Sequence, residues 1–141
     1  MIAKFRVDNL RHSLQALKEV WAAKTGNKDA ALDEIIDDSC VLRYNCALET
    51  AWKLMRKYLK LNYGKKDEEL TIYNIFRLMN AYNMIDDWEK WKSYYEKSET
   101  KFLSYAGETQ SERQSILDYV PRFIKDAQAL LDKFDAVLEN Q

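Results

Sequence analysis

The sequence is poor in residues that break helices and in residues that bind metals. Its 141 residues include three glycines, one proline, two cysteines and a single histidine. So few glycines and prolines leave little material for the tight turns of a many-stranded sheet. One histidine cannot supply both Glu-x-x-His pairs of a di-iron bundle, and a zinc site would need carboxylates for most of its ligands. We therefore expect no metal and no cofactor.

Long apolar runs and an excess of positive charge are also lacking. No run approaches the roughly 20 apolar residues that cross a bilayer, and the first residues turn polar at once, unlike a signal peptide. We expect a cytoplasmic protein without a membrane partner. The formal net charge of −1 gives no strong signal for nucleic-acid binding, although it allows a local basic patch. Cys40 and Cys46 have neither zinc nor redox spacing, and we expect two reduced thiols in the core.

Helical periodicity dominates what is present. Hydrophobic residues make up 47% of the chain and charged residues 32%. Apolar stripes at offsets of three and four predict helices over residues 8–24, 29–63, 71–82, from 86 or 87 through the following aromatic segment, and 111–138. Short connections imply antiparallel neighbours. The prediction is one all-α domain over residues 1–141, an up-and-down bundle of four or five helices.

Several residues predict where these helices start, bend or stop. Gly26 suits a left-handed helix end, and Pro121 predicts a kink or a break because it lacks an N–H group. The pairs Asp37–Asp38 and Asp86–Asp87 are interpreted as acids at helix starts, which the helix dipole favours. A bend is expected near residues 37–39, and residues 98–110 are expected to form a loop.

Glu49 is an acidic side chain with two possible interpretations, one structural and one functional. It lies beside an apolar stripe that includes Trp52, and it stands four residues before Lys53 on the same predicted helix. The simpler interpretation is a boundary ion pair with Lys53. The alternative is a partly buried carboxylate that accepts a hydrogen bond in a groove or interface. The sole histidine, His12, is expected at the solvent boundary of the first helix, and its role stays open.

The run Glu49-Thr50-Ala51-Trp52-Lys53, inside the longer segment 43–59, resembles the signature helix of the nucleotidyltransferase substrate-binding proteins of the HEPN-like superfamily. The similarity extends over most of the chain. It implies a helical bundle that forms a homodimer and works beside a small, separately encoded nucleotidyltransferase, in some cases as a toxin–antitoxin pair. One view of the family makes the bundle the subunit that holds the transferase's substrate.

Another view makes many members metal-independent ribonucleases that use an Arg and a His. The resemblance places that motif on residues 96–105, where Ser98 stands at the Arg position and Leu103 at the His position. Leucine can neither transfer a proton nor stabilise a charged phosphorus centre, so this route to RNA cleavage is excluded. Tyr105 matches a tyrosine to which the transferase can attach a nucleotide. The simpler interpretation of Tyr105 is a loop tyrosine that packs against the bundle. Lys97 and Lys101 keep the segment cationic and suited to a phosphate.

The sequence also holds an unusual number of aromatic residues, 13% of the chain. We expect part of the group Trp88, Trp91, Tyr94 and Tyr95 to lie in a dimer interface, because a small bundle has limited room for so many rings. The predicted function is a non-catalytic, substrate-binding or regulatory subunit with a nucleotidyltransferase partner and a nucleotide as candidate ligand. The alternatives are a ribonuclease with relocated residues and a protein-interaction module that has kept only the scaffold.

Overall fold

The structure is a computed structural model that describes residues 6–103 and 110–139, with only the backbone described for residues 99–103 and 110–112. The described residues contain six α-helices, one 3-10 helix and no strand. The elements are α1 (Asp8–Gly26), α2 (Ala30–Tyr63), η1 (Asp67–Glu69), α3 (Ile72–Ala81), α4 (Trp88–Leu103), α5 (Gln110–Leu117) and α6 (Val120–Glu139).

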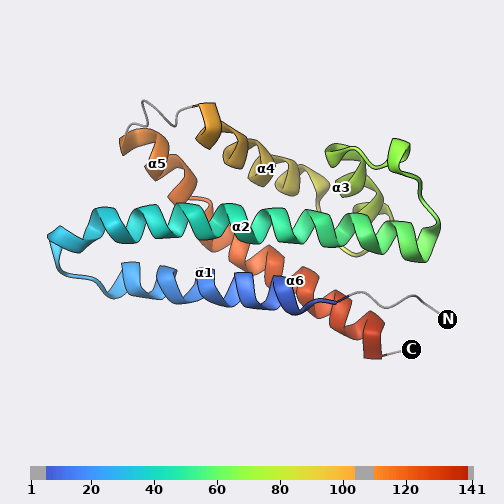
Figure 1. Cartoon of the computed structure of the whole chain (residues 1–141), viewed down its shortest axis with the longest axis horizontal. Coiled ribbons are helices and arrows are strands. Elements are labelled where there is room, and N and C mark those ends of the chain that lie inside the picture. The colour runs from blue at the N-terminus through green and yellow to red at the C-terminus, as the bar shows by residue number, and fades with distance from the viewer. Residues whose placement is uncertain (1–5, 104–109, 140–141) are drawn as a thin grey trace.

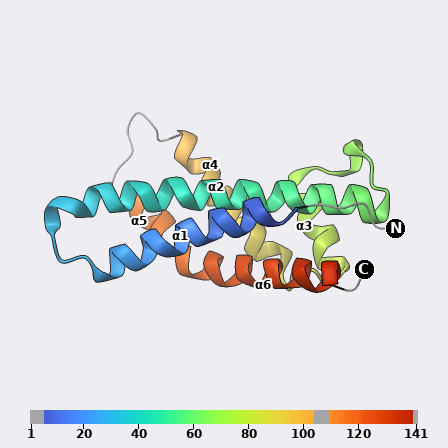
Figure 2. The same cartoon turned by 60° about the horizontal axis from the view of Figure 1, so that its bottom comes forward.

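Four long helices alternate in direction along the chain. α1 and α2 form an antiparallel hairpin, α4 returns against α2, and α6 runs back in the direction of α2 (Figures 1 and 2). The short helices α3 and α5 lie in the connections at opposite ends. The fold is therefore the predicted all-α, up-and-down bundle. The far end of the α1–α2 hairpin projects past the other helices in both views.

The helix ends follow local chemistry. The Asp29 side chain accepts a hydrogen bond from the Ala31 N–H at 3.0 Å and so begins α2. Gly64 ends α2 in the left-handed conformation with φ 62°. Asn83 follows α3 with the same φ, which asparagine tolerates better than most residues. Gly26 is the last residue of α1 but has no positive φ, so the left-handed end predicted there is wrong.

Three further expectations about the helices need correction. α2 is one unbroken helix, so Asp37 and Asp38 lie in its interior and are not helix-start acids. α4 continues to Leu103, six positions into the segment 98–110 that was expected to be a loop. The early apolar positions of α2 are not all in the core, since the side chains of Leu32 and Ile35 are 45% and 65% exposed.

The break predicted at the chain's proline is confirmed. A turn at Asp118–Tyr119 separates α5 from α6, and Pro121 is the second residue of α6. The first N–H groups of a helix have no intrahelical partner, so proline costs α6 no hydrogen bond there.

One apolar core joins all the long helices. α1 contributes Leu10, Leu14 and Leu17, and the inner side of α2 contributes residues including Tyr44, Leu48 and Met55. Phe123 and Phe134 of α6 are fully buried against them. Among the described residues, no helix is long and apolar enough to span a membrane.

Candidate functional site

A groove lined mostly by polar and charged side chains lies between α4 and α6. Its volume is about 340 Å³, which falls within the range of small-molecule pockets. Its lining residues are Asp86, Lys90, Ser93 and Tyr94 from α4 and the turn before it, and Tyr119, Arg122, Lys125 and Asp126 from α6 and the turn before it. We call this recess the α4–α6 groove. A smaller recess of about 170 Å³ adjoins it at Ser93 and Tyr119 and adds Glu96 and Lys97.

The inner wall of the groove is a network of buried tyrosines. Tyr94 is 2% exposed, and its hydroxyl donates a hydrogen bond to the Asp126 carboxylate. The fully buried Tyr44 of α2 donates from its own hydroxyl to the Tyr94 carbonyl oxygen at 2.8 Å. Phe123 packs edge-on against both rings. Each hydroxyl donates to an acceptor, as buried polar groups require, so this wall is held in one arrangement.

The same surroundings keep the two phenols protonated. Burial raises the pKa of Tyr94 far above its ordinary value, and the hydrogen bond to Asp126 raises it further. Burial likewise raises the pKa of Tyr44. Tyr94 therefore acts as a hydrogen-bond donor toward Asp126 throughout the neutral range and cannot serve as a base there.

Positive charge lines the outer part of the groove. Lys90 comes from α4, and Arg122 and Lys125 lie three residues apart on α6. None of the three forms an ion pair with another residue among those described. The Arg122 guanidinium lies 5.5 Å from the centre of the Tyr119 ring, and the Lys97 ammonium lies 5.2 Å from it. Lys90, Arg122 and Lys125, which have no ion-pair partner among the described residues, form a surface for a negatively charged group.

The groove has the means to bind but lacks the arrangement of a hydrolytic centre. It holds no histidine or cysteine, and Asp126 accepts its hydrogen bond from Tyr94, whose raised pKa keeps that phenol protonated. Within the described part of the chain, no group of three or more His, Cys, Asp or Glu residues could hold a metal ion.

Sequence reasoning missed most of this groove. Tyr94 was expected near an interface, Asp86 at a helix start, and Lys97 of the adjoining recess beside the family motif, but none was assigned to this groove. Arg122 and Lys125 look like the ordinary solvent side of an amphipathic helix, and nothing in their spacing points to Lys90, more than thirty residues earlier. The packing of α4 on α6 brings them together.

The predicted residues on α2 lie elsewhere. Glu49 and Lys53 form an exposed ion pair at 2.9 Å, as the simpler interpretation predicts, while a role of Glu49 in an interface stays a prediction. Trp52 is partly buried, and the Lys53 ammonium lies 5.9 Å from its ring. His12 is exposed as expected.

The aromatic group on α4 is divided between core and surface. Trp91 and Tyr94 are each 2% exposed, so the bundle does hide these two rings, contrary to the reasoning that placed them at an interface. Trp88 and Tyr95 are partly buried. The Arg77 guanidinium covers Trp88 at 4.5 Å, and the Tyr73 ring packs edge-on against Tyr95. Whether Trp88 and Tyr95 contact a partner stays a prediction.

The segment with the family's Arg/His positions is described in part. Ser98 is buried, and its hydroxyl donates to the Tyr95 carbonyl oxygen at 2.7 Å. Leu103 ends α4. Lys97 donates to the Ser115 hydroxyl and faces the smaller recess. The side chain of Lys101 and all of Tyr105 lie outside the described residues.

The two cysteines differ in environment. Both are free, but only Cys40 is buried, while Cys46 is exposed, so the prediction of two core thiols is half correct. Burial raises the pKa of the Cys40 thiol to about 11, and the Asp37 carboxylate nearby adds to that rise.

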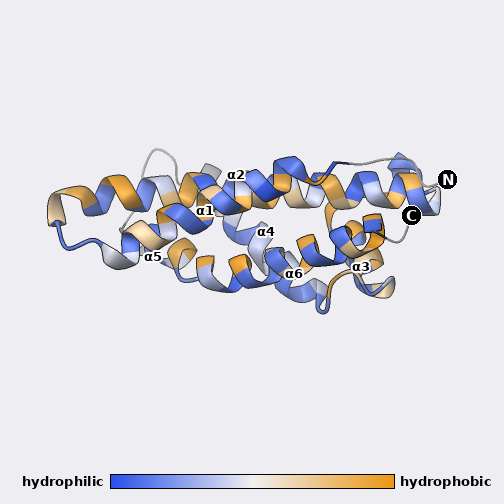
Figure 3. Cartoon of the chain, turned by 90° about the horizontal axis from the view of Figure 1, so that it is seen from below, coloured by the Kyte–Doolittle hydropathy of each residue, from blue (hydrophilic) through white to orange (hydrophobic). Residues whose placement is uncertain are grey.

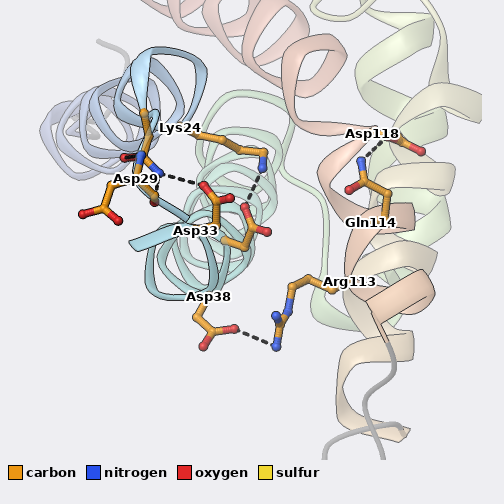
Figure 4. A network of polar contacts seen from close by, with 9 residues as sticks. Lys24, Asp29, Asp33, Asp38, Arg113, Gln114 and Asp118 are labelled. Carbon is orange, nitrogen blue, oxygen red and sulfur yellow. Dashed lines mark hydrogen bonds and ion pairs between the residues drawn. The ribbon is translucent and has the colours of Figure 1, made fainter. Parts of the chain in front are cut away.

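A second polar cluster ties the projecting end of the α1–α2 hairpin to α5. Lys24 of α1 pairs with Asp37 of α2 at 2.6 Å, and Arg113 of α5 pairs with Asp38 at 3.1 Å. Figure 4 shows these side chains with Asp33 close by, where the Asn27 amide donates to its carboxylate at 2.7 Å. Each of these carboxylates has a partner inside the fold, so the cluster is a structural tie rather than a vacant site.

The outer side of the same end carries apolar residues. Leu32, Ile35, Leu42 and Cys46 are exposed and recur at offsets of three, seven and four along α2; we call them the α2 stripe. Figure 3 shows apolar bands along this end of α2, which projects past α5 and α6. This spacing of apolar residues is typical of a helix that packs against another helix.

Comparison with known proteins places the chain. The family model of "Nucleotidyltransferase substrate binding protein like" proteins matches residues 5–136. The chain belongs to this family. Among solved structures, HI0074 of Haemophilus influenzae superposes with a TM-score of 0.80 at 14% identity, over 91% of this chain and 98% of that one. Its structure is described as revealing the fold of a substrate binding domain of a nucleotidyltransferase, and at this identity the likeness supports the fold alone. No curated protein matches the sequence.

Proposed function

We propose that this protein is a non-catalytic subunit that holds or presents the substrate of a separately encoded nucleotidyltransferase, with the α4–α6 groove as the place where the substrate lies. The family match over residues 5–136 carries the proposal. The groove supports it, because a recess of about 340 Å³ with cations on its rim and a fixed tyrosine wall suits binding better than bond cleavage.

The residues at the superfamily's nuclease positions agree with a binding role. Ser98 is buried and already donates its hydrogen bond to a backbone carbonyl, so it offers no cation to a phosphate. Leucine at 103 has no proton to move. Nucleotide attachment at Tyr105 stays part of the proposal. Mass spectrometry of the chain after incubation with the transferase and a nucleoside triphosphate tests it, with Tyr105→Phe as the variant that loses the added mass.

The transferase partner is tested by affinity capture of the tagged full chain from its native host. The expected result is co-purification of a small protein with a Gly-Ser motif followed by paired aspartates, the signature of a minimal nucleotidyltransferase. Recovery of the chain with other proteins alone, while a neighbouring gene encodes such a transferase, contradicts the proposal. An operon with such a gene whose product is toxic when expressed alone would place the pair in a toxin–antitoxin system.

We also propose that the protein works as a homodimer through the α2 stripe. Two antiparallel copies of α2 crossing near Ser39 bring Ile35 and Leu42 of each copy together, as a two-fold interface requires. Asp37 and Asp38 stand beside this crossing, but Lys24 and Arg113 already pair with them, which limits repulsion between the copies. An exposed apolar row of this length is unusual on a protein that stays monomeric.

Light scattering at micromolar concentration tests the dimer. We expect a dimer for the native chain and a folded monomer for the double variant Ile35→Lys and Leu42→Lys, because the added charges cannot be buried between two helices. The matched control is Lys53→Glu with Glu49→Lys, which reverses an exposed pair farther along α2. A native monomer, or a dimer that survives the double lysine change, contradicts this interface.

A further inference from the structure

The charges that line the α4–α6 groove are unevenly satisfied. Asp126 accepts a hydrogen bond from the Tyr94 hydroxyl, so the wall of the groove already engages its negative charge. Lys90, Arg122 and Lys125 have no anionic partner within ion-pair distance among the described residues. Among the described residues, the groove therefore holds three cations without an anionic partner and two carboxylates, of which Asp126 is engaged by the wall and Asp86 lies on the rim.

The placement of the three cations suits one compact anion. Arg122 and Lys125 lie one turn apart on α6, and Lys90 approaches from α4 across the same recess. A guanidinium and two ammonium groups that line one recess from two helices match the several oxygens of a phosphate better than the two oxygens of a carboxylate. The Tyr119 ring lies within 5.5 Å of the Arg122 guanidinium and limits the directions in which that group can turn.

We infer that the α4–α6 groove binds a phosphate-bearing ligand, with Arg122, Lys125 and Lys90 holding the phosphate and Tyr94 keeping Asp126 turned to the wall. This inference rests on the proposed function, because it names the class of substrate that the groove would take. The groove's volume of about 340 Å³ leaves room for more than the phosphate itself, which fits a phosphorylated small molecule.

Calorimetric titration of the full chain tests the inference with three probes: inorganic pyrophosphate, ATP and adenosine. We expect pyrophosphate and ATP to bind and adenosine to show no heat, because the phosphate is what the cations recognise. A tighter affinity for ATP than for pyrophosphate would identify the nucleotide as the source of the phosphate. Binding of adenosine equal to that of ATP would overturn the inference.

Variants that change the charge of the groove should change the affinity for pyrophosphate in a predictable direction. We expect Arg122→Gln to weaken pyrophosphate binding by about tenfold, since one charge-assisted contact is lost. Asp86→Asn should tighten binding about twofold to fivefold, because it removes a negative charge from the rim without adding a contact. Tighter pyrophosphate binding by Arg122→Gln together with weaker binding by Asp86→Asn would mean that the groove prefers a cation and would overturn the inference.

Lys28→Gln is the matched control, since Lys28 is exposed in the turn between α1 and α2, outside the groove, and forms no ion pair with a described residue. Equal losses for Lys28→Gln and Arg122→Gln would show attraction to overall charge and overturn the site. Circular dichroism confirms that each variant is folded. If the transferase co-purifies but no phosphate binds, this inference fails while the proposed function stands.

Discussion

The α4–α6 groove and the α2 stripe are two solutions to different tasks within one small bundle. The stripe is a row of exposed apolar side chains on one continuous helix, and the acids beside it are neutralised inside the fold. The groove joins two helices far apart in the sequence, and its cations Lys90, Arg122 and Lys125 have no anionic partner among the described residues. The contrast indicates that the stripe prefers a protein surface and the groove prefers an anion.

The largest expected effect is on the free energy of unfolding. It comes from replacing an apolar side chain by alanine, once beside the groove wall and once in the α2 stripe. Phe123 is fully buried against Tyr44, Trp91 and Tyr94, so Phe123→Ala should lower the free energy of unfolding by about 3–5 kcal/mol. Leu42 is 55% exposed, and Leu42→Ala should change the unfolding of the monomer by no more than about 0.5 kcal/mol. Urea denaturation at low protein concentration measures both, and similar losses would erase the distinction.

An intermediate effect compares the inner and outer ion pairs of α2. The Asp37 carboxylate is 11% exposed, and Lys24→Met leaves it without its partner, at a cost of about 1–3 kcal/mol in unfolding free energy. Glu49 is 58% exposed, and Lys53→Met should cost about 0–1 kcal/mol, because water replaces the lost partner. Thermal unfolding at low and high salt distinguishes them. A larger loss from Lys53→Met would contradict the burial of the first pair.

The smallest expected effect appears at alkaline pH and belongs to the groove side. The pKa values of Tyr44 and Tyr94 are raised in the folded chain above the value near 10 of an unfolded tyrosine, mainly by burial. Burial also raises the pKa of Tyr58, to about 12. A raised folded pKa gives stability that is complete below about pH 10 and is lost as the pH rises through the folded value.

The melting temperature should accordingly fall by a few degrees as the pH rises from about 9 to about 11, where an unfolded tyrosine loses its proton. Tyr94→Phe removes one of the groups responsible and should flatten this fall. A melting temperature that is constant over this range, or that rises, would contradict the burial of these phenols.

Much of the fold was accessible from the sequence, because it rests on local signals. The apolar spacing of α1 and α6, the Asp29 cap and the break at Pro121 act within a few residues. The family resemblance at Glu49–Lys53 was sound, and the family match confirms it. Local patterns gave wrong predictions for residues whose ion-pair partner lies far away in the sequence. Nothing within α2 shows that α5 supplies an arginine to Asp38, which explains why that acid was taken for a helix-start residue.

The α2 stripe and the α4–α6 groove could not be predicted from the sequence, for opposite reasons. Leu32 and Ile35 have the spacing of core residues, and only the length by which the α1–α2 hairpin outruns α4 to α6 leaves them exposed. Arg122 and Lys125 have the spacing of solvent-facing residues, and only the packing of α4 beside α6 gives them a groove to line. Periodicity says which side of a helix is apolar, but the neighbouring helices decide what covers each side.

The most direct test of the account is an amide NMR titration of the full, isotope-labelled chain with inorganic pyrophosphate. We expect chemical-shift changes concentrated on residues 90–94 and 119–126, with the amides of residues 32–46 unmoved. Saturable shifts in the first two segments that disappear in Arg122→Gln would support the groove as the binding site. Shifts confined to α2, or no shifts at millimolar pyrophosphate, would contradict it.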